Sequence, residues 1–303
     1  SQVDEKYSHI VARFRRELTH PERIRETELG NLFADIFTRS LGIDIMLIGS
    51  GSIRAEKLGP IVTYGDLIEG FPYDDGVYMF KVTGQQLRQM LRYMLREEAY
   101  AGHTEFYQLP STLRLRYDRA KGDFDYFTYC GKEVGKEIGD DALFTVGLQN
   151  YHFKNIESFF NISYDTICKL QKPRSVATSC QDILMEYFRE HEMLDAAVDG
   201  RMTILAPDGT VLEHRGTLDY ILCQFLPRGL AKLDAPVREI LRAALAQARY
   251  MQVPVSAAVN EAVKLTRAFK KSSASGLVNA VLRKACSYDL STASFKNEVE
   301  RLM

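Results

Sequence analysis

The spacing of apolar residues changes at Gly216, and this change limits the possible folds more than any other feature of the sequence. Before Gly216, stretches that alternate apolar and polar residues, as strands do, are interspersed with stretches at helical spacing. Beyond it only helical spacing remains. With 303 residues, the chain is long enough for two domains. The sequence therefore predicts a mixed α/β domain of the α+β kind over residues 1–205, a linker or hairpin over 206–215 and a small all-α bundle over 216–303.

In the first domain, helices are expected where apolar residues recur at helical spacing, and strands where they alternate between turn residues. Residues 1 to about 40 are expected to be helical, with an interruption near Pro21. Arg23 and Arg25 would then lie at the start of the second helix, where free backbone N–H groups favour an anion. The remaining expected elements are helices beginning after Thr83 and spanning 179–192, and strands over 43–48, 77–82, 113–117, 125–134, 142–148, 201–205 and 210–213.

A glycine-rich loop, Gly49–Arg54, follows the first of these strands. Gly49 and Gly51 have no Cβ, so the backbone there can turn sharply and approach a ligand closely. Arg54 leaves the loop with a planar guanidinium group that suits phosphate or carboxylate oxygens. Taken alone, these six residues favour an ordinary turn with Arg54 in a surface ion pair.

Four separated motifs give the loop a more specific meaning. They are, in order, Arg23-Ile24-Arg25-Glu26-Thr27-Glu28-Leu29-Gly30-Asn31, Gly51-Ser52-Ile53-Arg54, Phe71-Pro72-Tyr73 and Gln149-Asn150-Tyr151. Their order and spacing, over about the first two-thirds of the chain, resemble the C-terminal domain of 5'-nucleotidases. The resemblance implies a domain that binds a nucleoside 5'-monophosphate, while a separate N-terminal metallophosphatase domain with two metal ions performs the hydrolysis.

The resemblance also implies which residues bind this ligand. Arginines would contact phosphate or ribose oxygens, Tyr73 and Tyr151 would stack on the base, and Glu157 would replace an aspartate on the ribose hydroxyl groups. Structural roles remain open for Tyr73 in a turn, Tyr151 at the edge of the core, and Arg25 and Glu157 in solvent. The implied substrate-binding set is Arg23, Arg25, Asn31, Gly51, Arg54, Tyr73, Tyr151 and Glu157.

The chain departs from the family pattern in three places. Gly49-Ser50-Gly51 stands where the family has asparagine-glycine-glycine, so the chain lacks an amide side chain that would help to hold the ligand. Lys154–Ser158 replaces a glycine-rich loop with bulkier side chains. Tyr73 and Tyr151 stand where phenylalanines are usual, so the stacking faces are kept and two hydroxyl groups are added.

No metal or other cofactor is expected on this chain. A two-metal phosphatase site needs several His, Asp and Asn ligands that hold the ions about 3.5–4 Å apart. The six histidines are isolated in the sequence, and His152, beside Tyr151, is expected in the core or at the surface. Divalent metals are therefore expected only in a catalytic domain that the chain lacks, and the chain alone is expected to be inactive.

The helical part carries a second resemblance. Pro254–Val263 and Gly276–Arg283 resemble the NusB-like helical domain, in the version that precedes bacterial ribosomal-RNA cytosine methyltransferases, with its front helices missing. The resemblance implies RNA binding, and the rival reading of the whole chain is an RNA-binding or scaffold protein. An ordinary solvated helix face explains the basic residues equally well. The basic residues assigned to RNA are Lys264, Arg267, Lys270 and Lys271.

Composition excludes several other classes of protein. The net charge of −1 and the pI of about 6.6 do not indicate a polyanionic partner for the chain as a whole. The five cysteines are scattered and form no C-x-x-C pair, which favours reduced thiols over disulfides or a zinc site. No apolar run has membrane-spanning length, so no membrane partner and a cytoplasmic location are expected.

Overall fold

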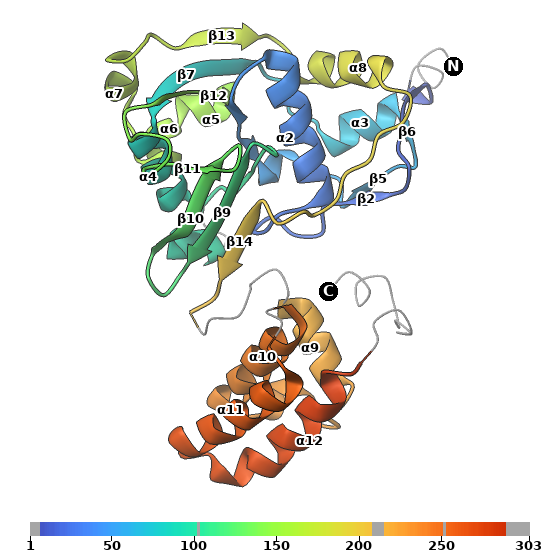
Figure 1. Cartoon of the computed structure of the whole chain (residues 1–303). Helices are drawn as coiled ribbons and strands as arrows, with labels where there is room; N and C mark the ends of the chain where they lie inside the picture. Colours follow the sequence, from blue (N-terminus) through green and yellow to red (C-terminus); the bar gives the residue numbers. More distant parts are fainter. Residues whose placement is uncertain (1–6, 102–103, 208–214, 251–252, 289–303) are drawn as a thin grey trace. The chain divides into compact units, whose positions relative to one another are not determined.

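A computed structural model of the chain describes residues 7–101, 104–207, 215–250 and 253–288. The chain divides into two compact units, unit 1 over residues 1–203 and unit 2 over residues 204–303 (Figure 1). Unit 1 mixes strands and helices, and the described part of unit 2 beyond the strand that ends at Leu205 is helical. The predicted fold class is therefore confirmed. Most of the predicted linker, and the strand expected over 210–213, lie outside the described residues.

Unit 1 is built around a four-stranded sheet with the order β13-β7-β12-β3. In its centre, β7 pairs antiparallel with β12 along the whole length of both strands, from Leu143 opposite Thr83 to Gln149 opposite Val77. Val77 and Met79 of β7 belong to the same core cluster as the buried side chains of α2 and α8. The bounds are β3 Ile45–Met46, β7 Val77–Thr83, β12 Leu143–Gln149, β13 Arg174–Ala177, α2 Glu28–Leu41 and α8 Cys180–Glu190.

A second sheet has the order β11-β10-β9-β14, and three short strand pairs complete the unit (Figure 1). The second sheet consists of β9 Leu113–Asp118, β10 Asp123–Tyr129, β11 Lys132–Glu133 and β14 Met202–Leu205. The pairs are β1 Ile10–Arg13 with β6 Ile61–Thr63, β2 Leu18–Thr19 with β5 Lys57–Leu58, and β4 Ile48–Gly49 with β8 Tyr107–Gln108. The other helices are α3 Tyr64–Gly70, α4 Gly84–Met94, α5 Asn150–Lys154, α6 Ile156–Phe160 and α7 Tyr164–Cys168, with 3-10 turns η1 Ser50–Ser52 and η2 Glu97–Ala101.

The expected helix at the N-terminus is wrong. Residues 10–13 form β1 because Ile10, Ala12 and Arg13 pair with a strand about fifty residues away, and tertiary pairing overrides local spacing. Helix α2 begins only at Glu28, where the Thr27 hydroxyl group accepts a hydrogen bond from the Gly30 N–H (3.1 Å). Arg23 and Arg25 therefore precede the helix and do not lie in its first turn.

The helix expected after Thr83 is confirmed, and its start shows how local sequence sets a boundary. The Thr83 hydroxyl group accepts from the Gln86 N–H (3.2 Å), and the Gln86 side chain accepts from the Thr83 N–H (2.9 Å). This reciprocal capping satisfies two backbone donors that a helix leaves free. Ser179 likewise caps α8 through the Asp182 N–H (3.0 Å).

Unit 2 packs its helices around one apolar cluster. Helix α9 begins at Arg215. The buried Arg242 of α10 pairs with Asp219 of α9 through two contacts of 2.6 Å. The bounds are α9 Arg215–Cys223, η4 Leu230–Lys232, α10 Ala235–Tyr250, α11 Val255–Ala268, η5 Ser272–Ala274 and α12 Ser275–Ala285. Within the described ranges, no helix is both long enough and apolar enough to cross a membrane.

Candidate functional site

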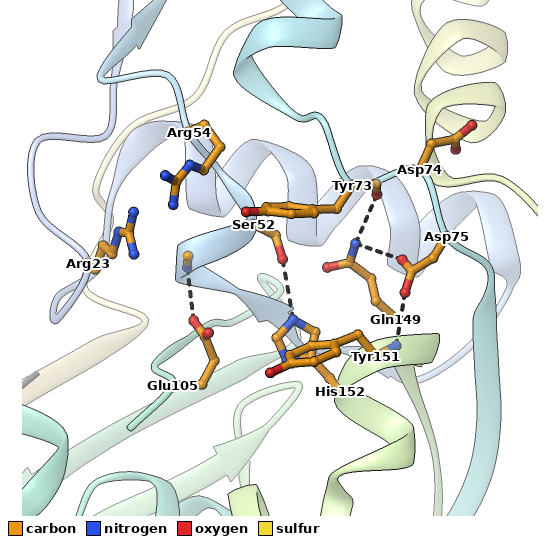
Figure 2. Close-up of a pocket in the computed structure, with 11 residues that line it drawn as sticks. Arg23, Ser52, Arg54, Tyr73, Asp74, Asp75, Glu105, Gln149, Tyr151 and His152 are labelled. Carbon is orange, nitrogen blue, oxygen red and sulfur yellow. Dashed lines mark hydrogen bonds between the residues drawn. The ribbon is translucent and has the colours of Figure 1, made fainter. Parts of the chain in front are cut away.

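One cavity of unit 1, of about 540 Å³, gathers side chains from segments that are far apart in the sequence (Figure 2). It includes five of the eight predicted ligand-binding residues, namely Arg23, Gly51, Arg54, Tyr73 and Tyr151. Arg25, Asn31 and Glu157 do not line it. The cavity also contains residues to which the sequence analysis gave no ligand-binding role: Ser52, Asp74, Asp75, Glu105, Gln149 and His152.

The pairing of β7 with β12 brings the two tyrosines together. Tyr73 lies shortly before β7 and Tyr151 shortly after β12, and because these strands are antiparallel, both tyrosines lie at the same end of the sheet. The Tyr151 N–H donates to Asp75 Oδ2 (2.9 Å), and this bond joins the two segments. Tyr73 is 51% exposed and Tyr151 is 60% exposed. Figure 2 shows their rings facing each other across the cavity.

The glycine-rich loop forms the 3-10 turn η1, as tight as the sequence predicted. The Ser50 N–H donates to the Phe106 carbonyl (2.6 Å) and the Arg54 N–H to the Gly70 carbonyl (2.7 Å). A Cβ on Gly51 would lie 3.0 Å from Glu105 Oε1, so the absence of a side chain there lets the Glu105 carboxylate approach the backbone closely. The surface ion pair considered for Arg54 is not observed among the described residues.

Glu105 is the acidic side chain beside the glycine-rich loop, and it belongs to none of the sequence motifs. Its Oε1 accepts a hydrogen bond from the Gly51 N–H (2.9 Å). Burial raises the pKa of Glu105. Hydrogen bonds from the backbone N–H groups of Gly51 and Phe106, and the charge of Arg23, act to lower this pKa but do not outweigh burial. Arg23 and Arg54 are exposed, and no ion pair of either is found within the described residues. Arg54 of the loop and Arg23, which precedes α2, therefore both present a guanidinium group to the cavity (Figure 2).

A chain of hydrogen bonds crosses the floor of the cavity. His152 Nδ1 lies 2.9 Å from the Tyr107 hydroxyl oxygen, and Nε2 lies 3.3 Å from Ser52 Oγ. Burial lowers the pKa of His152 to about 4, so the imidazole is neutral at physiological pH. A Cβ on Gly49 would overlap this imidazole. His152 therefore fills the space beside Gly49, and this position has no room for a side chain unless His152 moves.

The two aspartates of the cavity already have partners in the chain. Asp74 Oδ1 accepts from Ser179 Oγ (2.6 Å) and the Gln181 N–H (3.0 Å) at the start of α8. Asp75 accepts from the Tyr151 N–H and from Gln149 Nε2 (3.2 Å). Asp74 therefore joins its segment to the start of α8, and Asp75 joins it to the end of β12.

Three predicted ligand-binding residues lie elsewhere. Asn31 is fully buried, and its Nδ2 donates to Glu26 Oε1 (2.7 Å) and to the Ala197 carbonyl (2.8 Å), so its role is to anchor a neighbouring segment. Arg25 pairs with Glu22 at 3.4 Å. Glu157 is exposed in the first turn of α6.

The four basic residues assigned to RNA lie at and just beyond the end of α11. Lys264 pairs with Glu261 and Lys271 pairs with Asp234, each at 2.6 Å. Arg267 and Lys270 are exposed, and the described residues contain no ion-pair partner for either. Across the described part of both units, no group of three or more His, Cys, Asp or Glu side chains is placed to hold a metal ion.

Comparison with known families finds a different family in each of two parts of the chain. The model of the 5'-nucleotidase C-terminal domain matches residues 7–162, more than half of the chain. The chain belongs to the 5'-nucleotidase C-terminal domain family. The NusB family model matches residues 208–287. Both predicted resemblances are therefore confirmed.

Individual relatives match one unit or the other. A 5'-nucleotidase precursor from Thermus thermophilus is 24% identical with a TM-score of 0.56, and the match covers 67% of this chain and 41% of that one. The NAD nucleotidase of Haemophilus influenzae gives 15% identity and a TM-score of 0.51, with coverage of 67% and 39%. At these identities, the likeness establishes the fold alone.

Curated relatives match unit 2. The ribosomal RNA small subunit methyltransferase B of Xanthomonas campestris is 40% identical over 75 residues, which are 25% of this chain and 17% of that protein. The transcription antitermination protein NusB of the same species is 37% identical over 76 residues, 25% of this chain and 48% of that protein. The chain thus spans less than half the length of each of these relatives.

Proposed function

We propose that unit 1 binds a nucleoside 5'-monophosphate and is the substrate-recognition part of a metal-dependent 5'-nucleotidase. The observation that carries this proposal is the cavity in which Tyr73 and Tyr151 face each other beside Arg23 and Arg54 (Figure 2). A metal-bearing domain, to which the described residues of this chain contribute no ligand cluster, would perform the hydrolysis.

The rings suit a base because each offers an exposed stacking face. Stacking of a base on an aromatic side chain contributes about 1–3 kcal/mol per base, and it is tolerant of base identity. The tyrosines keep this face, and their backbone segments are held by the bond between the Tyr151 N–H and Asp75.

The arginines suit the phosphate for a complementary reason. Asp74 and Asp75 are engaged with the chain, whereas Arg23 and Arg54 have no ion-pair partner among the described residues. A phosphate dianion can accept charge-assisted hydrogen bonds from both guanidinium groups, and such bonds are about twice as strong as neutral ones.

Calorimetric titration of the chain with AMP and with adenosine tests the proposal. Arg54→Ala should weaken AMP binding by about ten- to a hundredfold, because it removes a charge-assisted hydrogen bond of roughly 1.5–3 kcal/mol. The same substitution should reduce the affinity for adenosine less, because adenosine has no phosphate. Arg54→Lys should restore only part of the affinity, since a point charge does not reproduce the guanidinium fork.

Arg189→Ala is the matched control, because Arg189 is an exposed arginine at the end of α8 outside the cavity. It should leave both affinities unchanged. The proposal is wrong if AMP shows no saturable binding, or if Arg54→Ala lowers the melting temperature while AMP affinity stays the same.

RNA binding by unit 2 is the second candidate. It is favoured by the NusB match over residues 208–287 and by relatives that are named for ribosomal RNA and for transcription antitermination. Lys and Arg side chains that neutralise phosphates give affinity that falls as salt rises. Titration of a single-stranded RNA at two salt concentrations is the direct test, and affinity that ignores salt would contradict this candidate.

A further inference from the structure

Gln149, the last residue of β12, carries a polar atom that the described chain leaves without a partner. Its side chain is 1% exposed and lines the cavity. The amide nitrogen Nε2 lies 3.2 Å from Asp75 Oδ1 and 3.4 Å from the Tyr73 carbonyl oxygen. The amide oxygen Oε1 is buried, with no hydrogen-bond partner among the described residues. Figure 2 shows this oxygen pointing into the space between the Tyr73 and Tyr151 rings.

The neighbours of Gln149 fix which end of the amide faces the cavity. A carboxylate and a backbone carbonyl only accept hydrogen bonds, so the amide nitrogen has to lie on their side. The opposite orientation would set an oxygen against two oxygens. Asp75 is itself held in place, because its other carboxylate oxygen accepts the Tyr151 N–H (2.9 Å). The cavity therefore presents a hydrogen-bond acceptor, and not a donor, between the two rings.

We propose that Gln149 determines base specificity, and that the slot between Tyr73 and Tyr151 takes a purine with an amino group at position 6, as in adenine. This inference rests on the proposed function. The 6-amino group would donate to Oε1 and relieve the cost of burying an acceptor without a partner. Hypoxanthine and guanine carry a carbonyl oxygen at the same position, and that oxygen would face Oε1.

The direction of the ligand follows from the other end of the cavity. Arg23 and Arg54 lie on the side of the rings away from Gln149 (Figure 2). A nucleotide whose phosphate contacts the arginines therefore directs the far edge of its base toward Oε1. Asp75 is a positioning residue in this arrangement, because it acts on the base only through the orientation of the Gln149 amide.

Titration of the full chain with three nucleotides tests the inference. The ligands are AMP, IMP and purine riboside 5'-monophosphate, which has only hydrogen at position 6. AMP should bind about ten- to a hundredfold more tightly than either of the others, as expected when a buried acceptor loses its donor. Gln149→Met should remove this preference while keeping the affinity for purine riboside 5'-monophosphate.

Asp75→Asn sharpens the test, because an asparagine amide can donate to Gln149 and lets the Gln149 amide turn around. The ratio of AMP to IMP affinity should fall. Asp182→Asn is the matched control, since Asp182 is an exposed carboxylate in the first turn of α8 that does not line the cavity, and it should leave the ratio unchanged. The wild-type ligand series needs no variant, so it holds even if a substitution impairs folding.

The outcomes separate this inference from the proposed function. Equal binding of the three nucleotides, or a preference for IMP, overturns the role of Gln149 and leaves nucleotide binding by unit 1 in place. Binding of none of them overturns both.

Discussion

Residues of the unit 1 cavity and the basic residues at the end of α11 in unit 2 were both predicted to bind ligands. In the structure the two sets differ in how their charged groups are paired. The cavity is formed by groups that are distant in sequence and that converge on one space, with Arg23 and Arg54 unpaired within the described chain. In unit 2, two of the four predicted basic residues, Lys264 and Lys271, pair with carboxylates. Convergence of unpaired groups is therefore stronger evidence for a ligand than a count of charges on a helix.

The two regions also differ in how they should respond to acid. Unit 1 contains His20, whose Nδ1 lies 2.8 Å from Thr27 Oγ1 and whose Nε2 lies 3.0 Å from the Ser50 carbonyl oxygen, and it contains His152. Burial lowers the pKa of each to about 4. The described residues of unit 2 include no histidine.

The largest expected effect is therefore a loss of stability of unit 1 between pH 7 and pH 5. Below about 6.5 the unfolded chain binds protons at these imidazoles, whereas the folded chain does not bind them until about pH 4. Their contribution is fully present above pH 6.5 and is lost as the pH falls toward 4. At pH 5 the loss is about 2 kcal/mol for each histidine.

Hydrogen exchange followed by mass spectrometry measures this effect peptide by peptide. Protection of core peptides in unit 1 should drop at pH 5, after correction for intrinsic exchange, while α10 and α12 peptides keep theirs. His152→Gln should reduce the drop in unit 1. An equal drop in both units would contradict the role of the two buried histidines.

The next largest effect concerns the stacking rings. Tyr73→Ala should weaken AMP binding by about 1–3 kcal/mol, since the aromatic face is lost, whereas Tyr73→Phe should keep most of the affinity. Tyr164→Ala is a matched control, because Tyr164 is 47% exposed and lies outside the cavity. Fluorescence or calorimetric titration gives the affinities. If Tyr73→Ala and Tyr164→Ala have the same effect, the difference between a convergent site and an ordinary exposed tyrosine disappears.

The sequence predicts the contiguous parts of the cavity well and the convergent parts poorly. Arg54 and Tyr73 belong to short motifs, so their presence in the cavity was expected. Glu105 belongs to no motif, and it enters because the strand pair β4–β8 places it beside Gly51. The sequence does not reveal the role of Gln149 either, because the orientation of its amide depends on Asp75, which lies in the distant segment just before β7.

The fold shows the same limit. Helix α4 and its Thr83 cap depend on residues three positions apart, so local reasoning finds them. Strand β1 depends on pairing with β6, and no local pattern in residues 10–13 reveals that partner. Asn31 shows a third case, in which a motif residue is present but its amide anchors Glu26 and Ala197 and is buried away from the cavity.

The smallest expected effect separates paired from unpaired charges in unit 2. If the end of α11 binds RNA, Lys270→Glu should weaken binding more than Lys264→Glu, because Lys264 already pairs with Glu261 and Lys270 has no ion-pair partner within the described residues. Each phosphate contact that is lost should reduce the slope of log affinity against log salt by about 0.7–0.9. Electrophoretic or fluorescence titration with a single-stranded RNA at several salt concentrations gives this slope. A salt slope that neither substitution changes would show that these charges are an ordinary solvated face, and unit 2 would then differ from unit 1 in having no ligand at this surface.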